Sequence, residues 1–319
     1  MTIEFASARA VEKPWGRTDL RPWSEAAGRH GRIGEIWYER TDPAAQEPTL
    51  LLKLLFTREP LSIQVHPGDA FAQSIGEVRG KSEAWYVMSA EPGGRIALGL
   101  DRRLTSQQLR EAIADGSIVE RIAWRDVSCG DVVDVPAGSI HAIGAGLVIA
   151  EIQQRSDTTY RLFDHGRSRA LHVEQAVAVA DAGLAPAGPV PRALGPGRTL
   201  LITSPHFILE KIDAPPRSKW SVRAQHETWL LVLSGHVRIG LMNALAGEAV
   251  FLEREATTLK AGAAGMQALV AYGARQPDMM MLRLISGSQS RIGGVASAPA
   301  RVPLTMTQGP NPTAPEVRT

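Results

Sequence analysis

The residues best suited to chemistry are two histidines, a glutamate and a glutamine that a β-fold could bring to one point. His141 follows a short alternating segment, residues 131–135, and a Pro-x-Gly turn whose glycine lies three positions before it. His66 belongs to the segment Gln64-Val65-His66, and Glu83 comes later in the chain. Two imidazoles and a carboxylate leave positions open for water or substrate, as in catalytic zinc sites. An amide oxygen from Gln64 would move the preference towards harder divalent ions.

Strand geometry predicts how these side chains are positioned. Residues two apart in a strand point to the same face. Gln64 and His66 therefore share a face, while their neighbours in sequence take the other. Lys81 and Glu83 share a face in the same way if that segment is a strand. The sequence thus predicts that β-strands bring these residues together.

Most of the chain has the pattern of short strands separated by glycine turns, with two helices. A capping box at Thr105 and Gln108 predicts a helix over residues 106–114, and a second helix is predicted over 171–180. Alternation and β-branched or aromatic residues predict strands at 51–65, 84–88, 131–135, 147–153, 200–212, 229–233, 236–241 and 279–284. The predicted class is all-β with a few helices.

Composition excludes several classes of protein. Hydrophobic residues make up 44% of 319 residues, mean hydropathy is −0.09, and net charge is +2. So balanced a charge does not favour nucleic-acid binding. There is no apolar run of about 18 residues, so no membrane span is expected. The first residues lack the pattern of a secretory signal, and the single cysteine, Cys129, has no intramolecular partner; both favour a cytoplasmic protein. The oligomeric state is not indicated.

The metal motifs resemble those of the cupins. The frame Gly-x5-Pro-x-Gly-x2-His that ends at His141 resembles the second cupin motif. The order Gln64-x-His66…Glu83 resembles a variant of the first. The resemblance implies double-stranded β-helix (jelly-roll) barrels whose motif residues bind a metal.

Longer segments narrow the resemblance to the type I mannose-6-phosphate isomerases (phosphomannose isomerases). The similar segments are 61–67, 80–86, 141–144, 151–164 and 171–174, with weaker matches at 13–16 and 34–37. Together they cover roughly residues 10–180 in the family's order. The segment 42–48 is shorter than in relatives, and the C-terminal half carries no signature of the family.

This resemblance implies roles for particular residues. His66, Glu83 and His141 match the ligands of one zinc ion per chain, and Gln64 matches a fourth ligand of some members. Arg161 matches the family's active-site arginine. Lys81 and Ser62 match residues of the family that line the substrate-binding pocket.

The implied reaction interconverts mannose 6-phosphate and fructose 6-phosphate through a cis-enediol. Arg161 would stabilise charge on the sugar oxygens. Lys81 is one candidate for the general base, and the base stays open. No glycine loop that cradles phosphate is visible, so phosphate would be bound by Lys81, Ser62 or another Lys or Arg at the rim. Two alternatives remain, an isomerase of a different sugar or sugar phosphate and a non-catalytic sugar-binding cupin.

Length and composition predict two domains. A catalytic cupin domain with the metal site is expected at 1–183, followed by a Pro/Ala/Gly-rich linker at 184–196. A second, degenerate cupin-like domain is expected at 197–290, because His226-Glu227 resembles a first motif but no Pro-x-Gly-x2-His turn follows. Residues 291–319 are predicted to be a disordered tail.

Overall fold

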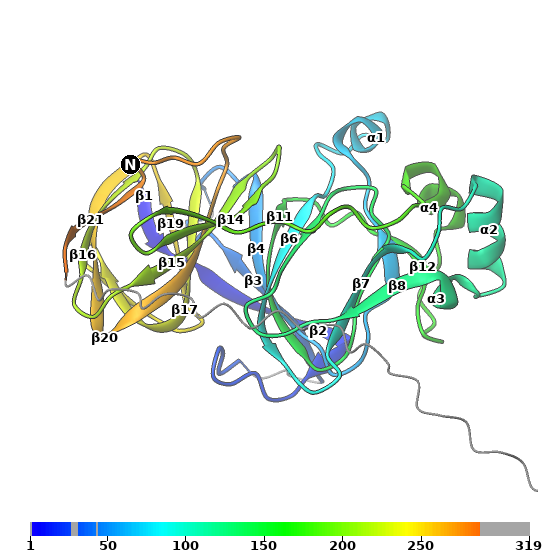
Figure 1. The fold of residues 1–319 in the computed structure, drawn as a ribbon, viewed down its shortest axis with the longest axis horizontal. Helices are drawn as coiled ribbons and strands as arrows, with labels where there is room; N and C mark the ends of the chain where they lie inside the picture. Colours follow the sequence, from blue (N-terminus) through cyan, green and yellow to red (C-terminus); the bar gives the residue numbers. More distant parts are fainter. Residues whose placement is uncertain (1, 27–30, 43, 288–319) are drawn as a thin grey trace, which may run out of the picture. The chain divides into compact units, whose positions relative to one another are not determined.

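Antiparallel sheets dominate the computed structural model, which describes residues 2–26, 31–42 and 44–287. Within these residues there are three sheets and four helices (Figure 1). This confirms the prediction of a mostly β protein with few helices, while the division into two barrels stays a prediction. The predicted tail at 291–319 lies outside the described residues. None of the helices described is long and apolar enough to cross a membrane.

A six-stranded sheet lies at the centre of the described chain and carries half of the candidate site. Its strand order is β2-β3-β4-β11-β6-β9. Its strands are β2 (Ser7–Arg17), β3 (Ile33–Glu39), β4 (Leu50–Phe56), β6 (Glu83–Ala90), β9 (Val132–Val135) and β11 (Leu147–Gln154).

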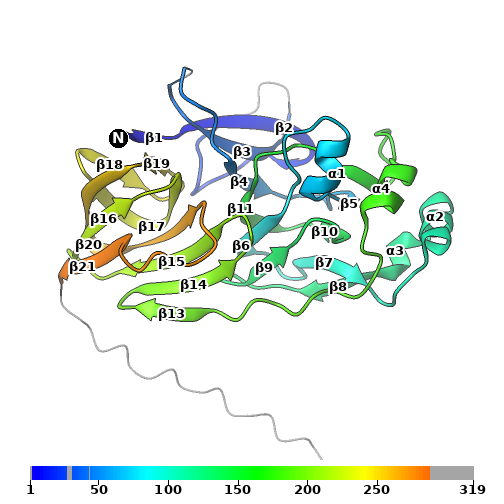
Figure 2. The same ribbon diagram turned by 90° about the horizontal axis from the view of Figure 1, so that it is seen from above.

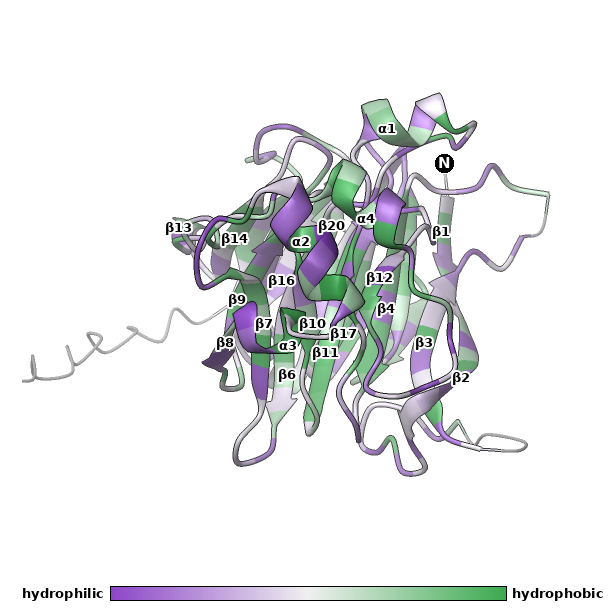
Figure 3. Cartoon of the chain, turned by 90° about the vertical axis from the view of Figure 1, so that its right-hand side faces the viewer, coloured by the Kyte–Doolittle hydropathy of each residue, from purple (hydrophilic) through white to green (hydrophobic). Residues whose placement is uncertain are grey.

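A five-stranded sheet supplies the other half, in the order β12-β5-β10-β7-β8. Its strands are β5 (Ile63–Val65), β7 (Arg95–Leu100), β8 (Ile122–Asp126), β10 (His141–Ile143) and β12 (Tyr160–Phe163). The helices are α1 (Asp69–Ser74), α2 (Ser106–Ala114), α3 (Ile118–Arg121) and α4 (Val173–Val179). Ile63 and Val65 share a buried cluster with Leu109 of α2 and Ala176 of α4, so these helices cover the outer face of the sheet. Figure 3 shows that α2 turns hydrophilic residues outwards.

The C-terminal part forms a ten-stranded sheet (Figure 2). Its strands are β1 (Thr2–Phe5), β13 (Arg192–Gly195), β14 (Arg198–Thr203), β15 (Ile208–Ala214), β16 (Lys219–Ala224), β17 (Thr228–Ile239), β18 (Met242–Leu245), β19 (Ala249–Glu253), β20 (Glu255–Tyr272) and β21 (Leu282–Ser286). The N-terminal strand β1 pairs with β19 and not with the sheets that carry the site.

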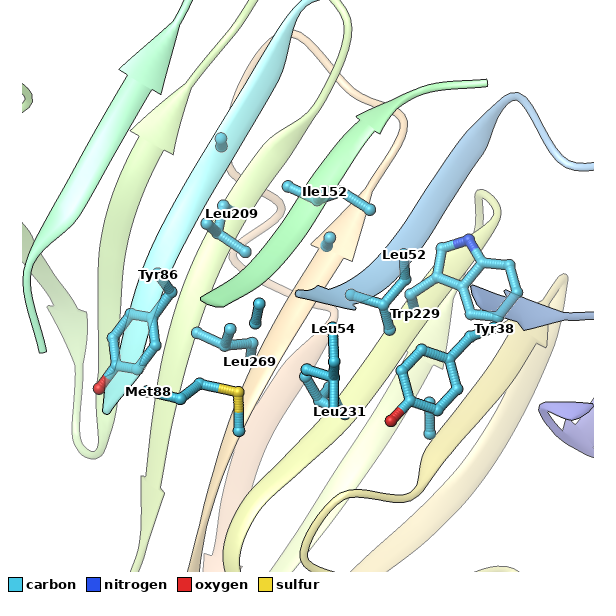
Figure 4. Close-up of a cluster of buried hydrophobic side chains, with 14 of the residues drawn as sticks. Tyr38, Leu52, Leu54, Tyr86, Met88, Ile152, Leu209, Trp229, Leu231 and Leu269 are labelled. Carbon is cyan, nitrogen blue, oxygen red and sulfur yellow. The ribbon is translucent and has the colours of Figure 1, made fainter. Parts of the chain in front are cut away.

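The central sheet buries both of its faces, which explains why β4 reads Leu-Leu-Leu-Lys-Leu-Leu-Phe without polar alternation. Leu52 and Leu54 point to one face and pack against Trp229, Leu231 and Leu269 of the ten-stranded sheet (Figure 4). Lys53 lies between these two leucines in sequence and therefore points to the opposite face, where it lines a cavity. The site thus lies on the face of the central sheet that is turned away from the C-terminal sheet.

Sequence predictions of individual elements agree with the structure in part. The strand predicted at 200–212 is two strands, β14 and β15, and the strand predicted at 279–284 begins only at Leu282. The helix predicted at 106–114 is α2, and its capping box at Thr105 and Gln108 is present. The helix predicted at 171–180 corresponds to α4. The predicted strands 229–233 and 236–241 fall largely in one strand, β17, and residues 192–195 of the predicted linker form β13. Because Met1–Ser288 forms one compact unit, the proposed domain boundaries stay a prediction.

Glu227, which resembles a cupin motif residue, ties the C-terminal sheet to the central sheet. Its carboxylate accepts hydrogen bonds from the Thr49 amide at 2.6 Å, the Thr49 hydroxyl at 2.8 Å and the Leu50 amide at 2.7 Å. Leu50 begins β4, so one side chain from the C-terminal part fixes the start of a strand that lines the site. The structure gives Glu227 no histidine and carboxylate neighbours that could complete a metal site among the described residues.

We predict that Glu227→Ala lowers the free energy of unfolding by roughly 1–3 kcal/mol, because two backbone amides and a hydroxyl lose a charged acceptor. Urea unfolding would measure this change. The matched control is Glu120→Ala, which removes an exposed glutamate from α3. Equal stability of the two variants would contradict the role assigned to Glu227.

Candidate active site

Three buried side chains bring their donor atoms together between the central and five-stranded sheets. His66 follows β5, Glu83 begins β6 and His141 begins β10. One donor atom of each lies within 4.8 Å of those of the others, and each residue is 1% exposed. The convergence expected from the spacing of these residues is therefore present. Their role as metal ligands is taken up below.

Both imidazoles are oriented by backbone carbonyls. His66 Nδ1 lies 2.9 Å from the carbonyl oxygen of Thr158, and His141 Nδ1 lies 2.9 Å from that of Ser139. Because a carbonyl can only accept, each Nδ1 carries the proton and each Nε2 presents its lone pair towards Glu83. Metal-binding histidines in proteins are usually held in this way.

The protonation states also suit a divalent metal. Burial and the neighbouring His66 lower the pKa of His141 to about 3, so its imidazole is neutral. Burial and Lys81 lower the pKa of His66 as well. Burial alone would raise the pKa of Glu83, but Lys81 and His66 hold it well below its usual range. Two neutral imidazoles and a carboxylate are the forms that bind metal.

Lys81 places a cation directly against these donors. Its Nζ lies 2.8 Å from Glu83 Oε1 and 3.2 Å from His66 Nε2. Glu83 Oε1 otherwise makes no hydrogen bond of good geometry. The donor atoms of His66, Glu83 and His141, here called the donor set, therefore stabilise positive charge. The residues present fit a metal ion. Burial would lower the pKa of Lys81, but Glu83 and Glu151 raise it, so the ammonium form dominates and Lys81 is better suited to binding an anion than to accepting a proton.

Gln64 lies beside the histidine ligands but turns its amide nitrogen to them. Its Nε2 is 3.3 Å from His141 Nε2, and its Oε1 accepts a hydrogen bond from Ser62 Oγ at 2.9 Å. Rotation of the amide about its last bond would bring the oxygen to the donor set. Gln64 thus lies beside the donor atoms of His141, and Ser62 orients its amide.

A closed loop joins two of the ligand-bearing segments. Residues 67–81 leave His66 and return to Lys81, and the amide of Lys81 donates to the Pro67 carbonyl at 2.9 Å. Asp69 accepts from the Gly80 amide at 2.8 Å and from Gln154 at 2.9 Å. A side chain at Gly80 would collide with the backbone of Pro67 and Gly68 at about 2.5 Å, so only glycine fits this neck.

The central sheet contributes a row of charges of alternating sign. Cross-strand register aligns Lys53 of β4 with Glu151 of β11, and Glu151 with Trp85 of β6. Lys53 Nζ lies 3.8 Å from Glu151, and Lys13 Nζ lies 3.3 Å from Glu35 of β3. The row lines one wall of the cavity.

Glu151 is the titratable group best placed to move a proton at neutral pH. Burial and the nearby Glu83 raise its pKa to about 7, while burial and Lys81 lower the pKa of Lys53. The indole of Trp85 donates to Glu151 at 3.1 Å and to Glu83 at 3.2 Å, so it links Glu151 to the donor set. A buried carboxyl group with a pKa near 7 is typical of general acid–base catalysts.

Arg161 lies on the opposite wall. On adjacent strands of the five-stranded sheet, Gln64 pairs in register with both His141 and Arg161. Arg161 therefore lies two strands from a histidine ligand and lines the same cavity. Its Nε is buried without a hydrogen-bond partner, and burial and Arg169 lower its pKa. It is a cation whose charge is incompletely compensated.

These walls enclose a cavity whose empty volume, including solvent at its mouth, is about 610 Å³. The part of this space that water-sized molecules can enter is smaller, about 90 Å³. Lys81, Ser62, Gln64 and Arg161 all line it, as the sequence predicted. Sequence analysis missed several lining residues: Lys13, Glu35, Lys53, Glu151, Asp157 and Arg169. The signal was available for Lys53 and Glu151, since a lone charge within an apolar strand must be compensated when that strand is buried on both faces.

Comparisons with known proteins bear on this site. No family model matches the chain. The chain is 38% identical over 206 residues to a mannose-6-phosphate isomerase of Streptococcus mutans, covering 60% of this chain and 63% of that protein. It is 30% identical over 206 residues to a probable mannose-6-phosphate isomerase of Bacillus subtilis, covering 53% and 65%. The matches therefore span slightly less than two thirds of these relatives.

Solved structures agree with the sequence matches. A mannose 6-phosphate isomerase from Bacillus subtilis superposes with a TM-score of 0.73 at 24% identity, over 85% of this chain and all of that one. A mutant phosphomannose isomerase from Salmonella typhimurium gives a TM-score of 0.68 at 13% identity, over 86% and 100%. At these identities the structures establish the fold alone. Together with the sequence matches, they show that the chain is similar to mannose-6-phosphate isomerases over part of its length and shares the fold of solved ones.

Proposed function

We propose that the protein is a metal-dependent isomerase that interconverts mannose 6-phosphate and fructose 6-phosphate. The observation that carries this proposal is the buried set His66, Glu83 and His141 beside a cavity that also contains Glu151 and Arg161. A sugar-binding protein has no need of a buried carboxyl group with a pKa near 7 next to a metal site. The relatives named as mannose-6-phosphate isomerases support the choice of substrate.

The charges around the cavity support a dianionic substrate. Five cationic side chains line it, and three carboxylates line it with them. The lining side chains therefore carry two more positive than negative charges when all are ionised. A sugar phosphate dianion restores neutrality, which an unphosphorylated sugar does not.

We infer that the metal is one zinc ion per chain, held by His66, Glu83 and His141 with Gln64 as a possible fourth ligand. Two imidazoles with a carboxylate are a common ligand set of catalytic zinc. When bound, the ion would act as a Lewis acid that polarises sugar oxygens. The hydrogen bonds of the two Nδ1 atoms to backbone carbonyls keep the ligands ready for it.

The side chains of the cavity would move the protons. In the forward reaction Glu151 accepts the proton from C2 of the aldose, which leaves an enediolate. The same carboxyl group returns this proton to C1, while the hydroxyl proton of O2 passes to O1. Arg161 stabilises negative charge that develops on the sugar oxygens. Lys81, held as an ammonium by Glu83, adds a second fixed positive charge. This role replaces the general-base role considered for Lys81 from the sequence.

The proposed setting is cytoplasmic. No helix described in the structure is long enough to span a membrane, and sugar phosphates are intracellular metabolites of cells in general. The proposed partner is therefore a small sugar phosphate, without nucleic acid or membrane.

Purified protein loaded with zinc should convert mannose 6-phosphate to fructose 6-phosphate in a coupled assay. Removal of metal with a chelator should abolish turnover, and added zinc should restore it, since the metal is expected to polarise the substrate. Efficiency on free mannose should be much lower. Equal or higher efficiency on free mannose would move the protein to another sugar substrate, and no turnover of any sugar would favour a binding protein.

His141→Ala should lose stoichiometric zinc, because one of three buried ligands disappears. Metal analysis of dialysed protein measures this, and thermal unfolding checks that the variant is folded. His236→Ala, which removes an exposed histidine of β17, is the control and should keep its zinc. Retention of one zinc per chain by His141→Ala would refute the ligand assignment.

Arg161→Ala should lower kcat by roughly 10²–10³, the effect of losing one preorganised stabilising group. Glu151→Gln should lower it by roughly 10²–10⁴, the range for general acid–base catalysis. Both variants should keep their zinc. Arg125→Ala, on the exposed side of β8, is the control. Turnover of Arg161→Ala at the wild-type rate would leave this arginine a structural role only.

A further inference from the structure

We propose that Lys13 and Arg169 form the site that binds the phosphoryl group of the substrate, at the mouth of the cavity. This inference rests on the proposed sugar-phosphate isomerase activity and assigns a part of it that the sequence left open. Both residues line the same cavity as Arg161. Neither belongs to the set predicted from the sequence.

Exposure separates the cavity into a deep end and a mouth. Glu83 and the two histidines are 1% exposed, and the side chains of Lys53 and Lys81 are 3% and 5% exposed. The side chains of Lys13 and Arg169 are 27% and 30% exposed. The reacting carbons must reach the deep donor set. The phosphoryl group, at the far end of a hexose, then lies at the mouth, where these two cations are.

The deep lysines are engaged elsewhere. Lys81 contacts Glu83 and His66, and Lys53 lies 3.8 Å from Glu151 and packs over the ring of Trp37 at 4.3 Å. A phosphoryl group bound there would hold negative charge next to Glu83 and Glu151. A phosphoryl group at the deep lysines would also occupy the position that the reacting carbons of the sugar need.

Arg169 is held in place and still has free donors. Its Nε and one terminal nitrogen donate to Asp164, at 2.7 and 2.5 Å. The remaining N–H groups of the fork donate to no protein atom among the described residues and are available to a ligand. Arg161 lines the same cavity, and its Nε is buried without a hydrogen-bond partner. Two arginines with unused donors in one cavity are suited to binding a dianion.

Lys13 has a comparable arrangement on the opposite edge. Its Nζ makes one ion pair, with Glu35 at 3.3 Å, and a lysine ammonium has three donors. The carboxylate of Glu35 is also bound by the Trp37 indole and is 8% exposed, so it is a fixed anchor for Lys13.

A chain of ion pairs joins the two edges of the mouth. Arg32 donates to the carbonyl of Pro14, next to Lys13, and pairs with Glu59 at 2.6 Å. Glu59 also pairs with Arg167 at 3.2 Å, and Arg167 pairs with Asp164, which holds Arg169. The same network therefore links the segments that carry Lys13 and Arg169, which line the same cavity.

Steady-state kinetics of the zinc-loaded enzyme test this proposal. Lys13→Gln removes one charge, and Arg169→Lys keeps the ion pair with Asp164 while removing the spare guanidinium donors. Each should lower kcat/KM for mannose 6-phosphate by roughly tenfold to a hundredfold, the effect of one charge-assisted hydrogen bond, mainly through KM. Efficiency on free mannose should stay within about twofold, and inhibition by inorganic phosphate should weaken by a factor like that for the substrate.

Matched controls separate this role from a general loss of charge. Lys211→Gln removes a lysine that pairs with Asp213 at 3.1 Å and is 23% exposed, much like Lys13. Arg110→Lys alters an arginine with a bidentate pair to Glu174, much like Arg169. Neither residue lines the cavity, and both controls should behave as wild type.

The outcomes are distinguishable from a failure of the proposed function. If the wild type turns over mannose 6-phosphate and both variants match it, or lose equal efficiency on free mannose, the phosphoryl site is elsewhere. If the wild type turns over no sugar, the proposed function fails, and calorimetric titration of zinc-loaded protein with inorganic phosphate decides separately. Weaker phosphate binding by both variants then supports the site, and unchanged binding overturns it.

Discussion

The compensation of buried charge is the constraint on which the site depends. The donor set and the row of charges on the central sheet lie between two sheets, where an unpaired charge is very costly. Each buried charge is therefore set against one of opposite sign, as in Lys81 with Glu83 and Lys53 with Glu151. Burial and the nearby Glu83 raise the pKa of Glu151 to about 7 although Lys53 lies 3.8 Å away. The ability of Glu151 to exchange a proton near neutral pH thus follows from the arrangement of buried charges around it.

The sheets make that balance possible by fixing register. Lys53, Glu151 and Trp85 are direct neighbours across three adjacent strands, so their spacing is set by backbone hydrogen bonds and not by flexible side chains. On the facing sheet, His141, Gln64 and Arg161 form a second row. A slip of one residue in β4 or β11 would exchange these charges with leucine and isoleucine side chains of the other face. The packing of the central sheet on the ten-stranded sheet therefore also holds the chemistry in place.

Local patterns in the sequence were sufficient for much of this structure. The capping box at Thr105 predicts α2, because it depends on residues three apart. The convergence of His66, Glu83 and His141 was expected because their motifs resemble those of the cupins. Glu35 and Arg169 could not be found in this way. Their roles depend on which strand lies beside which, and on a loop that folds back to the mouth. Such long-range pairing is not encoded in any local pattern.

The motif at His226-Glu227 shows how a similar sequence can acquire a different role. At the start of β6, Glu83 has two histidine neighbours supplied by β5 and β10. At the start of β17, Glu227 has backbone amides of Thr49 and Leu50 as neighbours and binds them as a carboxylate binds any well-placed donor. A glutamate thus pairs with the Lys81 ammonium in one context and binds the backbone amides at the start of β4 in the other. What differs is the set of partners that the surrounding sheet provides, so the function of a motif residue follows from its neighbours in the fold.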